Sequence, residues 1–155
     1  ELPDKGKALV LGLGGGDLAK ILEKTKPKWK TVFVELEPEI VDVARKYFGI
    51  VNHSNRSLIT ADARSYMERN KDKFDVVIVD LYSGDSVPDF VTSRKFLKQV
   101  GLAIKPKGIA IFNYASHSFR EKDFGEFTLK LSKVFTDVQQ FKYVGHPFFV
   151  AKFIK

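Results

Sequence analysis

Four acidic side chains stand where they could contact a nucleotide. Asp17 ends a glycine-rich run, and short apolar runs precede the other three, which are Glu35, Asp62 and Asp80. Short apolar runs that alternate with helical patterns predict parallel strands, and ligands of such sheets bind outside the carboxyl ends of the strands. The four carboxylates therefore predict a crevice that attracts positive charge and accepts hydrogen bonds from hydroxyl groups.

The glycine-rich run, Gly12-Leu13-Gly14-Gly15-Gly16, leads into a helical pattern that begins at Asp17. Glycines there let the backbone turn tightly and approach a ligand closely. The dinucleotide fingerprint requires another glycine at position 17, and a carboxylate in its place repels a pyrophosphate. S-adenosylmethionine has no phosphate, and Asp17 attracts its sulfonium and ammonium groups. We expect this ligand, rather than a nicotinamide dinucleotide, at Gly12, Gly14, Gly15, Gly16 and Asp17. The alternative for Asp17 is a helix N-cap.

The acids after the second and third apolar runs are expected to hold an adenosine. Glu35, with Leu36 beside it, ends the second run about twenty residues after the glycines, where a carboxylate can accept both ribose hydroxyls. Asp62 can accept a hydrogen bond from the adenine amino group, with the backbone N–H of the neighbouring Ala63 reading the ring. The alternatives are a solvated strand end for Glu35 and an N-cap for Asp62.

The elements that position these residues alternate along the chain. Strand patterns are expected over residues 8–11, 31–34, 57–60, 74–80, 108–113, 138–143 and 148–154. Helical patterns are expected over residues 17–24, 38–48, 63–70, 93–104 and 124–134. The turn signal Gly145-His146-Pro147 predicts an antiparallel hairpin between the last two strands. The fold class is therefore α/β, with a Rossmann-like, doubly wound, mostly parallel seven-stranded sheet that ends in an antiparallel hairpin. A single domain is expected over residues 1–155.

The composition restricts the partners and the compartment. With 44% hydrophobic residues and no apolar run of about 20 residues, no membrane partner is expected. The absence of cysteine is in keeping with a cytoplasmic protein, and the three histidines lack the spacing of a metal site, so no metal is expected. A formal charge of +7 is read as a solubilising surface and leaves nucleic acid open as a partner.

Several motifs together resemble a known family. The nucleotide-binding motifs of spermidine synthase and its relatives resemble Val10-Leu11-Gly12-Leu13-Gly14-Gly15-Gly16-Asp17, Val34-Glu35-Leu36-Glu37, Ala61-Asp62-Ala63-Arg64 and Val79-Asp80. Tyr47-Phe48-Gly49 and the run from Tyr82 to Pro88 look like the bacterial and archaeal spermidine-synthase-like proteins. The chain thus resembles the spermidine-synthase-like branch of the class I S-adenosylmethionine-dependent methyltransferase superfamily.

The resemblance implies roles for individual residues. Glu35 would bind ribose, Asp62 adenine, and the glycine loop the amino-acid or aminopropyl end of S-adenosylmethionine or its decarboxylated form. Asp80 would lie beside the sulfonium and take the proton from an attacking amine. Apart from the resemblance, Tyr82 lies two residues after Asp80 and could wall the pocket for a small-molecule acceptor, and Asp85 could add negative charge to that pocket. A homodimer is one option, because dimers are common in this family.

The chain also departs from the family pattern after the fourth strand. Spermidine synthases carry Asp-Ser-Ser-Asp there, whereas this chain has Asp80-Leu81-Tyr82-Ser83 with its next acid at Asp85. It also starts directly at the first strand, without the N-terminal β-rich domain of those enzymes, and its +7 charge opposes a polycationic substrate. These departures favour methyl transfer to an unidentified acceptor, with aminopropyl transfer as the first alternative and a non-catalytic nucleotide-binding relative as the second. Asn113-Tyr114 resembles the acceptor loop of amino-methylating enzymes, but it follows the fifth strand and stays outside the expected site.

Overall fold

The computed structural model describes residues 2–84, 86–114, 121–143 and 146–152. Its strands are β1 (Lys7–Leu11), β2 (Lys30–Glu35), β3 (Arg56–Thr60), β4 (Phe74–Val79), β5 (Ile104–Asn113), β6 (Asp137–Tyr143) and β7 (His146–Lys152). Its helices are α1 (Asp17–Thr25), α2 (Pro38–Phe48), α3 (Ala63–Arg69), the short 3₁₀ helix η1 (Asp89–Thr92), α4 (Arg94–Ala103) and α5 (Glu121–Ser132). Strand and helix alternate from β1 to α5, as the sequence patterns predict.

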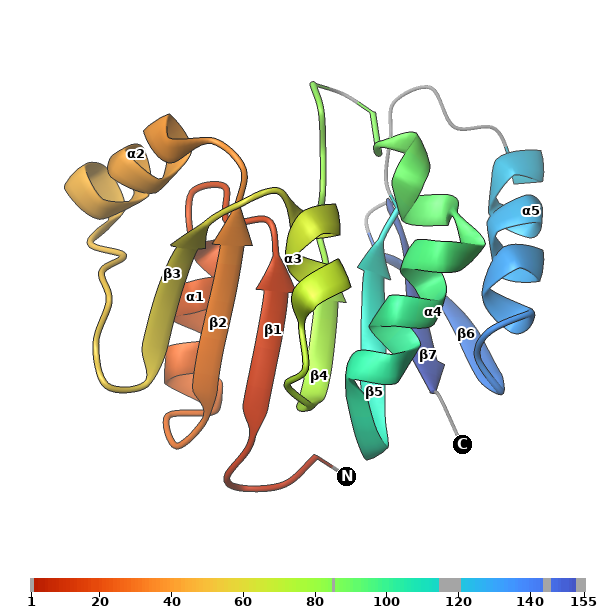
Figure 1. The fold of residues 1–155 in the computed structure, drawn as a ribbon, viewed down its shortest axis with the longest axis horizontal. Helices are drawn as coiled ribbons and strands as arrows, with labels where there is room; N and C mark the ends of the chain where they lie inside the picture. Colours follow the sequence, from red (N-terminus) through yellow and green to blue (C-terminus); the bar gives the residue numbers. More distant parts are fainter. Residues whose placement is uncertain (1, 85, 115–120, 144–145, 153–155) are drawn as a thin grey trace.

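The strands form one seven-stranded sheet in the order β3-β2-β1-β4-β5-β7-β6. Neighbours from β3 to β5 pair in parallel, whereas β7 pairs antiparallel with both β5 and β6. This is the class I methyltransferase fold, so the predicted fold class is confirmed. All five parallel strands point their carboxyl ends toward the same edge, which is the upper edge in Figure 1.

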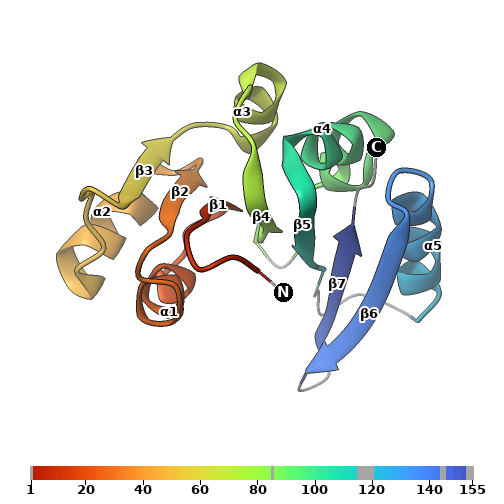
Figure 2. The ribbon, with the colours of Figure 1, turned by 90° about the horizontal axis from the view of Figure 1, so that it is seen from below.

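Helices cover both faces of the sheet and create two cores. Helices α3 and α4 lie on one face, and α1 and α2 lie on the other (Figure 2). The core under α3, α4 and α5 contains alternate strand residues such as Leu9, Val77 and Phe112. The core under α1 and α2 contains the residues between them, such as Val10 and Ile78. Strands buried on both faces must be apolar throughout, which is why β1 and β4 read as continuous hydrophobic runs.

The structure differs from the sequence expectations at two connections. Strand β5 begins at Ile104, where Ile104 pairs with Phe74, four residues before the expected start. The polar residues between Ile104 and Gly108 hide this start, since they carry no strand pattern. At the other connection, His146 and Pro147 belong to β7 rather than to a turn, and Tyr143 pairs with His146. Residues 144 and 145 lie outside the described residues.

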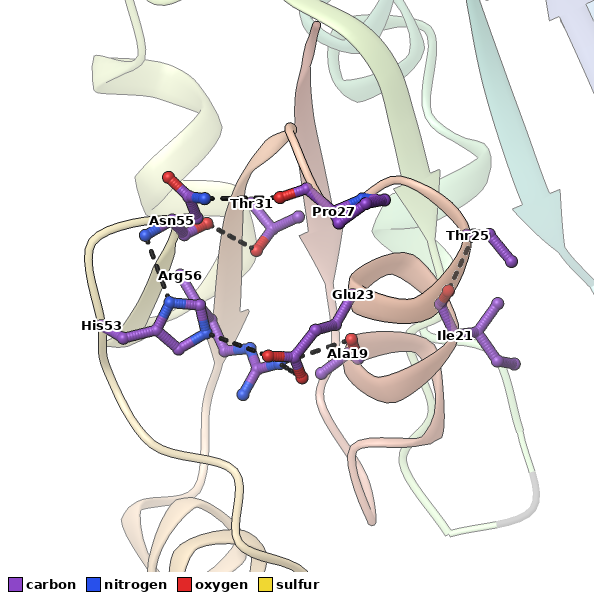
Figure 3. A network of polar contacts seen from close by, with 9 residues as sticks. All are labelled: Ala19, Ile21, Glu23, Thr25, Pro27, Thr31, His53, Asn55 and Arg56. Carbon is purple, nitrogen blue, oxygen red and sulfur yellow. Dashed lines mark hydrogen bonds and ion pairs between the residues drawn. The ribbon is translucent and has the colours of Figure 1, made fainter. Parts of the chain in front are cut away.

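A polar cluster ties α1 to the amino ends of β2 and β3, at the edge opposite the glycine run (Figure 3). The guanidinium of Arg56 is only 4% exposed and donates to Glu23 Oε2 at 2.6 Å and to the carbonyl oxygen of Ala19 at 3.5 Å. His53 Nε2 lies 3.7 Å from the other Glu23 oxygen, and His53 Nδ1 accepts from the Asn55 amide. A buried cation needs such partners, so this cluster fixes the helix to the sheet.

Removing the carboxylate from this cluster is expected to destabilise the fold. Glu23→Ala leaves the Arg56 guanidinium buried without its charged partner, at a cost of about 1–2 kcal/mol in the free energy of unfolding. The matched control is Glu126→Ala in α5, where Glu126 pairs with Lys130 at 2.8 Å on the surface, at a cost within about 0.5 kcal/mol. Urea unfolding measures both, and equal losses would contradict the assigned role of Glu23.

Candidate functional site

The carboxyl ends of β1, β2 and β4 meet at Gly12. Its φ is +100°, and a Cβ atom on residue 12 would collide with the backbone carbonyl oxygen of Asp80. The Gly12 amide donates to the carbonyl of Val34 at 2.8 Å, and the Asp80 amide donates to the carbonyl of Leu11 at 2.9 Å. Only glycine allows this approach, and the approach brings Asp80 beside the glycine loop.

The rest of the glycine loop divides into an open part and a packed part. Gly14 has φ +52°, is exposed, and has no atom within 4 Å of an added Cβ. Gly16 has φ +84° and forms the N-cap of α1. A Cβ atom added at Gly16 would clash with the side chain of Ile50. Asp17 begins the helix with an exposed side chain and makes no capping hydrogen bond, so the N-cap alternative for Asp17 is wrong.

Glu35, the last residue of β2, fastens the glycine loop to the sheet. Its Oε2 accepts from the Leu13 amide at 2.9 Å, and its Oε1 accepts from the amides of Leu36 at 2.8 Å and Glu37 at 3.2 Å. The alternative of a merely solvated strand end therefore does not describe Glu35, which has a structural role. A carboxylate has about four acceptor positions, so one oxygen site stays available to a ligand hydroxyl. Ribose binding by Glu35 and Leu36 stays a prediction.

Asp62 follows β3 and caps α3. Its Oδ1 accepts from the Ser65 amide at 2.7 Å, and this hydrogen bond lowers the pKa of the carboxyl below its ordinary value. The N-cap interpretation of Asp62 is thus confirmed, while Ala63 beside it is buried in the first turn. Contact with adenine stays a prediction for Asp62 and Ala63.

Asp80, directly after β4, is paired with the end of the neighbouring strand. Asn113 Nδ2, at the end of β5, donates to Asp80 Oδ1 at 2.8 Å. Burial of Asp80 raises the pKa of its carboxyl above the ordinary value, and the hydrogen bond from Asn113 partly offsets this effect. The carbonyl oxygen of the same amide, Asn113 Oδ1, is buried without a hydrogen-bond partner among the described residues.

Asn113 is the site residue that the sequence analysis left out. The usable signal was its position at the carboxyl end of a strand adjacent to β4, which places the two side chains at the same edge. Its neighbour Tyr114 behaves differently, because it is buried and stacks on Phe127 with ring centroids 4.0 Å apart. Tyr114 therefore belongs to the core rather than to an acceptor loop.

The loop after β4 carries the expected acceptor residues. Tyr82 is 40% exposed two residues beyond Asp80, and Ser83 and Ser86 form an isolated bridge in which the Ser83 amide donates to the Ser86 carbonyl at 2.8 Å. Asp85 lies outside the described residues. The role of Tyr82 and Asp85 at the acceptor pocket stays a prediction.

The described residues contain neither a cluster that could bind a metal ion nor a helix that could span a membrane. Across the parts of the chain that the structure describes, no three histidine and acidic side chains gather in a way that could hold a metal ion. None of the helices in those same parts is long and apolar enough to cross a bilayer.

Solved structures with the same architecture define the class of the protein. Human methyltransferase-like protein 13, solved in complex with SAH, matches 97% of this chain and 72% of its own at a TM-score of 0.87 and 22% identity. A spermidine synthase solved in complex with the transition state analogue AdoDATO matches 97% of this chain and 54% of its own at a TM-score of 0.74 and 21% identity. The protein is an α/β domain with the class I methyltransferase fold.

Sequence similarity then identifies the family. The model of the spermine/spermidine synthase domain matches residues 2–155, so the chain belongs to that family. A polyamine aminopropyltransferase of Vibrio vulnificus is 29% identical over 119 residues, which are 75% of this chain and 40% of that protein. An eEF1A lysine and N-terminal methyltransferase homolog of Drosophila melanogaster is 30% identical over 114 residues, which are 68% of this chain and 17% of that protein. The chain thus spans less than half the length of these relatives.

The contact between Gly12 and Asp80 predicts unequal effects within one loop. Gly12→Ala is expected to cost more than about 3 kcal/mol in unfolding free energy or to prevent folding, because its Cβ would clash with the carbonyl oxygen of Asp80, directly after β4. Gly14→Ala is the matched control, since it also has positive φ but lies in open space, and it is expected to cost about 1–2 kcal/mol. Urea unfolding and soluble yield measure both variants, and comparable effects would refute the close approach.

The pairing of Asp80 with Asn113 predicts a shift in one titration. Asn113→Leu removes the donor that lowers the pKa of Asp80, so the pKa should rise further, as measured by carbon-13 NMR of the carboxyl group. The folded chain binds this proton more tightly than the unfolded chain does. The stability that Asp80 contributes is therefore complete below the unfolded pKa of about 4 and is lost as the pH rises through the folded pKa. The pKa of Asp62, which caps α3 and has no contact with Asn113, should be the same in Asn113→Leu as in the unchanged chain. A fall in the Asp80 pKa would contradict the assignment.

Proposed function

We propose that this chain is an aminopropyltransferase domain, which moves an aminopropyl group from decarboxylated S-adenosylmethionine to an aliphatic amine. The observation that carries the proposal is the half-buried carboxylate of Asp80, held by Asn113 next to the glycine loop. Family membership over residues 2–155 supports it, as does the name of the Vibrio vulnificus relative. Aminopropyl transfer thereby takes precedence over the methyl transfer that the sequence alone favoured.

The described residues suit an adenosine donor that carries positive charge and lacks phosphate. Gly14 leaves open space above the loop, and the Asp17 carboxylate stands exposed at the start of α1, where it would disfavour a pyrophosphate. In this proposal Gly12 to Asp17 hold the aminopropyl end of the donor. Glu35 with Leu36 would bind the ribose, and Asp62 with Ala63 the adenine. The donor supplies a sulfonium leaving group, which makes the displacement easy once the partners are aligned.

Asp80 has the properties of the proton acceptor in this reaction. The amine nitrogen attacks the carbon attached to sulfur, the carbon–sulfur bond breaks with its electron pair on sulfur, and one proton leaves the nitrogen for Asp80. A base works best when its pKa approaches the working pH, and burial moves the pKa of Asp80 in that direction. Asn113 orients the carboxylate by its hydrogen bond to Oδ1, which leaves Oδ2 for the amine.

Methyl transfer is the second candidate, and a cation near the loop favours it. Lys20 Nζ lies 5.3 Å from the centroid of the Phe48 ring, and the edge of that ring lies 3.9 Å from the Cβ position of Gly15. S-adenosylmethionine, unlike its decarboxylated form, has a carboxylate that could pair with such a cation. The Drosophila melanogaster relative also has a methyltransferase name. The net charge of +7 also favours this candidate, because a positively charged surface does not attract a polycationic acceptor.

Product analysis distinguishes the candidates without knowledge of the natural acceptor. The chain is incubated with either donor and a series of aliphatic diamines or a lysine-containing peptide, and the nucleoside product is identified by mass spectrometry. Aminopropyl transfer releases methylthioadenosine from the decarboxylated donor, whereas methyl transfer releases S-adenosylhomocysteine from S-adenosylmethionine. We expect methylthioadenosine with a diamine. Only S-adenosylhomocysteine would support the second candidate, and donor binding without either product would support the non-catalytic alternative.

Asp80→Asn tests the proposed base. The variant keeps the size of the side chain and its place beside the loop, so donor binding measured by calorimetry should change less than about threefold. Turnover should fall by about 100-fold or more, because general-base catalysis contributes factors of this order. Unchanged turnover in Asp80→Asn would show that Asp80 does not accept the proton.

A further inference from the structure

A small cavity lies at the edge of the sheet opposite the glycine run, between the carboxyl-terminal half of α1 and the amino ends of β2 and β3. Its volume is about 150 Å³, and its walls include the polar cluster of Figure 3. A cavity of this volume can hold one six-membered ring. The residues proposed for the donor and the acceptor do not line it, so the cavity is separate from the proposed active site.

Arg56 brings unused hydrogen-bond donors to this cavity. Its side chain is 4% exposed, and its Nη2 donates to Glu23 Oε2 and to the carbonyl oxygen of Ala19. Its Nε and Nη1, which carry three of the five guanidinium N–H groups, make no hydrogen bond to any of the described residues. Neither nitrogen is sealed off, since Asn113 Oδ1 is the single fully buried side-chain atom without a partner in those residues. A guanidinium with free donors at a cavity wall can bind a carboxylate through two parallel hydrogen bonds.

The charges around the cavity favour one negative charge on its ligand. The lining has two cations, Arg56 and Lys26, and one carboxylate, Glu23, which leaves a charge of +1 with His53 neutral. The ammonium of Lys26 lies 5.4 Å from the centroid of the Trp29 ring. A monoanion balances this charge, whereas a dianion would add repulsion from the Glu23 carboxylate.

Apolar side chains form the other walls of the cavity, and they are those of Leu22, Pro27 and Trp29. The indole of Trp29 is 2% exposed, and its Nε1 donates to the carbonyl oxygen of Pro3 at 2.9 Å, which holds the ring in place. Apolar walls with a few polar groups are typical of sites for small organic molecules. The ligand therefore needs an apolar body as well as an anionic group, which disfavours a hydrated inorganic ion.

We propose that this cavity binds a small organic monoanion, a carboxylate with a ring-sized apolar body. The carboxylate lies against Arg56 and Lys26, and the ring lies against Leu22 and Trp29. The inference does not depend on the proposed function, because it uses neither the glycine loop nor Asp80. A ligand of about nine non-hydrogen atoms binds weakly, with a dissociation constant on the order of 1 mM.

NMR titration of the full chain with benzoate tests the cavity. Trp29 is the one tryptophan of the sequence, so its indole N–H resonance reports on this place alone. Benzoate should shift that resonance, and the amide resonances of residues 19–23 and 53–56, in a saturable manner. Benzamide lacks the charge and acetate lacks the ring, so each should bind at least about tenfold more weakly. No saturable shift at about twenty times the expected dissociation constant, or equally tight binding of either analogue, overturns the inference.

Two neighbouring lysines provide matched variants. Lys26→Gln and Lys28→Gln each remove one positive charge, but Lys28 does not line the cavity, is 62% exposed and lies 3.9 Å from Asp4. Lys26→Gln should weaken benzoate binding roughly fivefold, whereas Lys28→Gln should change it less than about twofold. Equal effects would show that benzoate responds only to the net charge of the surface, which overturns the site.

Arg56→Lys tests the contact with the carboxylate directly. The variant keeps a positive charge near Glu23 but removes the planar fork of donors, so benzoate affinity should fall at least about tenfold. Circular dichroism and urea unfolding establish whether the variant folds. Unchanged affinity in the folded variant would overturn the assigned contact, and if the variant does not fold, the comparison of Lys26→Gln with Lys28→Gln decides.

Discussion

The site depends on one close approach between backbones, that of β1 and β4 at Gly12. The carbonyl of Asp80 occupies the space where residue 12 would carry a side chain, and the Asp80 amide is held by the carbonyl of Leu11. A larger residue 12 would push the end of β4 outward and carry the Asp80 carboxylate away from the loop. The same glycine joins β1 to β2 through the Val34 carbonyl, so three strand ends are fixed at a single point.

Burial raises the pKa of the Asp80 carboxyl and so sets its protonation behaviour. Asp80 lies between two strands in a place where water solvates it poorly, and the pKa of its carboxyl rises for that reason. Asp62, at the end of β3, shows the opposite behaviour because its own helix supplies an amide donor. Two carboxylates at the same edge of one sheet therefore differ in character, one suited to accept a proton and the other a charged hydrogen-bond acceptor.

Much of this arrangement was predictable from the sequence, because the signals are local. Alternating apolar runs and helical patterns predict the elements, and α2 occupies the expected residues from Pro38 to Phe48. The partner of Asp80 was missed because Asn113 is 33 residues away in sequence, and only strand order makes the two neighbours. The early start of β5 was missed because Lys105 and Lys107 carry no strand signal, although the backbone pairs. The role of Glu35 as an anchor for its own loop depends on side-chain direction, which spacing does not encode.

That anchoring limits how this domain can diversify. Three backbone amides, at Leu13, Leu36 and Glu37, depend on the Glu35 carboxylate, so an exchange of this residue would loosen the loop even in the absence of any ligand. In the loop that follows Tyr82, Ser83 and Ser86 form a backbone bridge with each other. In the proposed site, acceptor preference could therefore change through substitutions after β4, whereas the residues proposed to hold the nucleoside also support the loop and are harder to exchange.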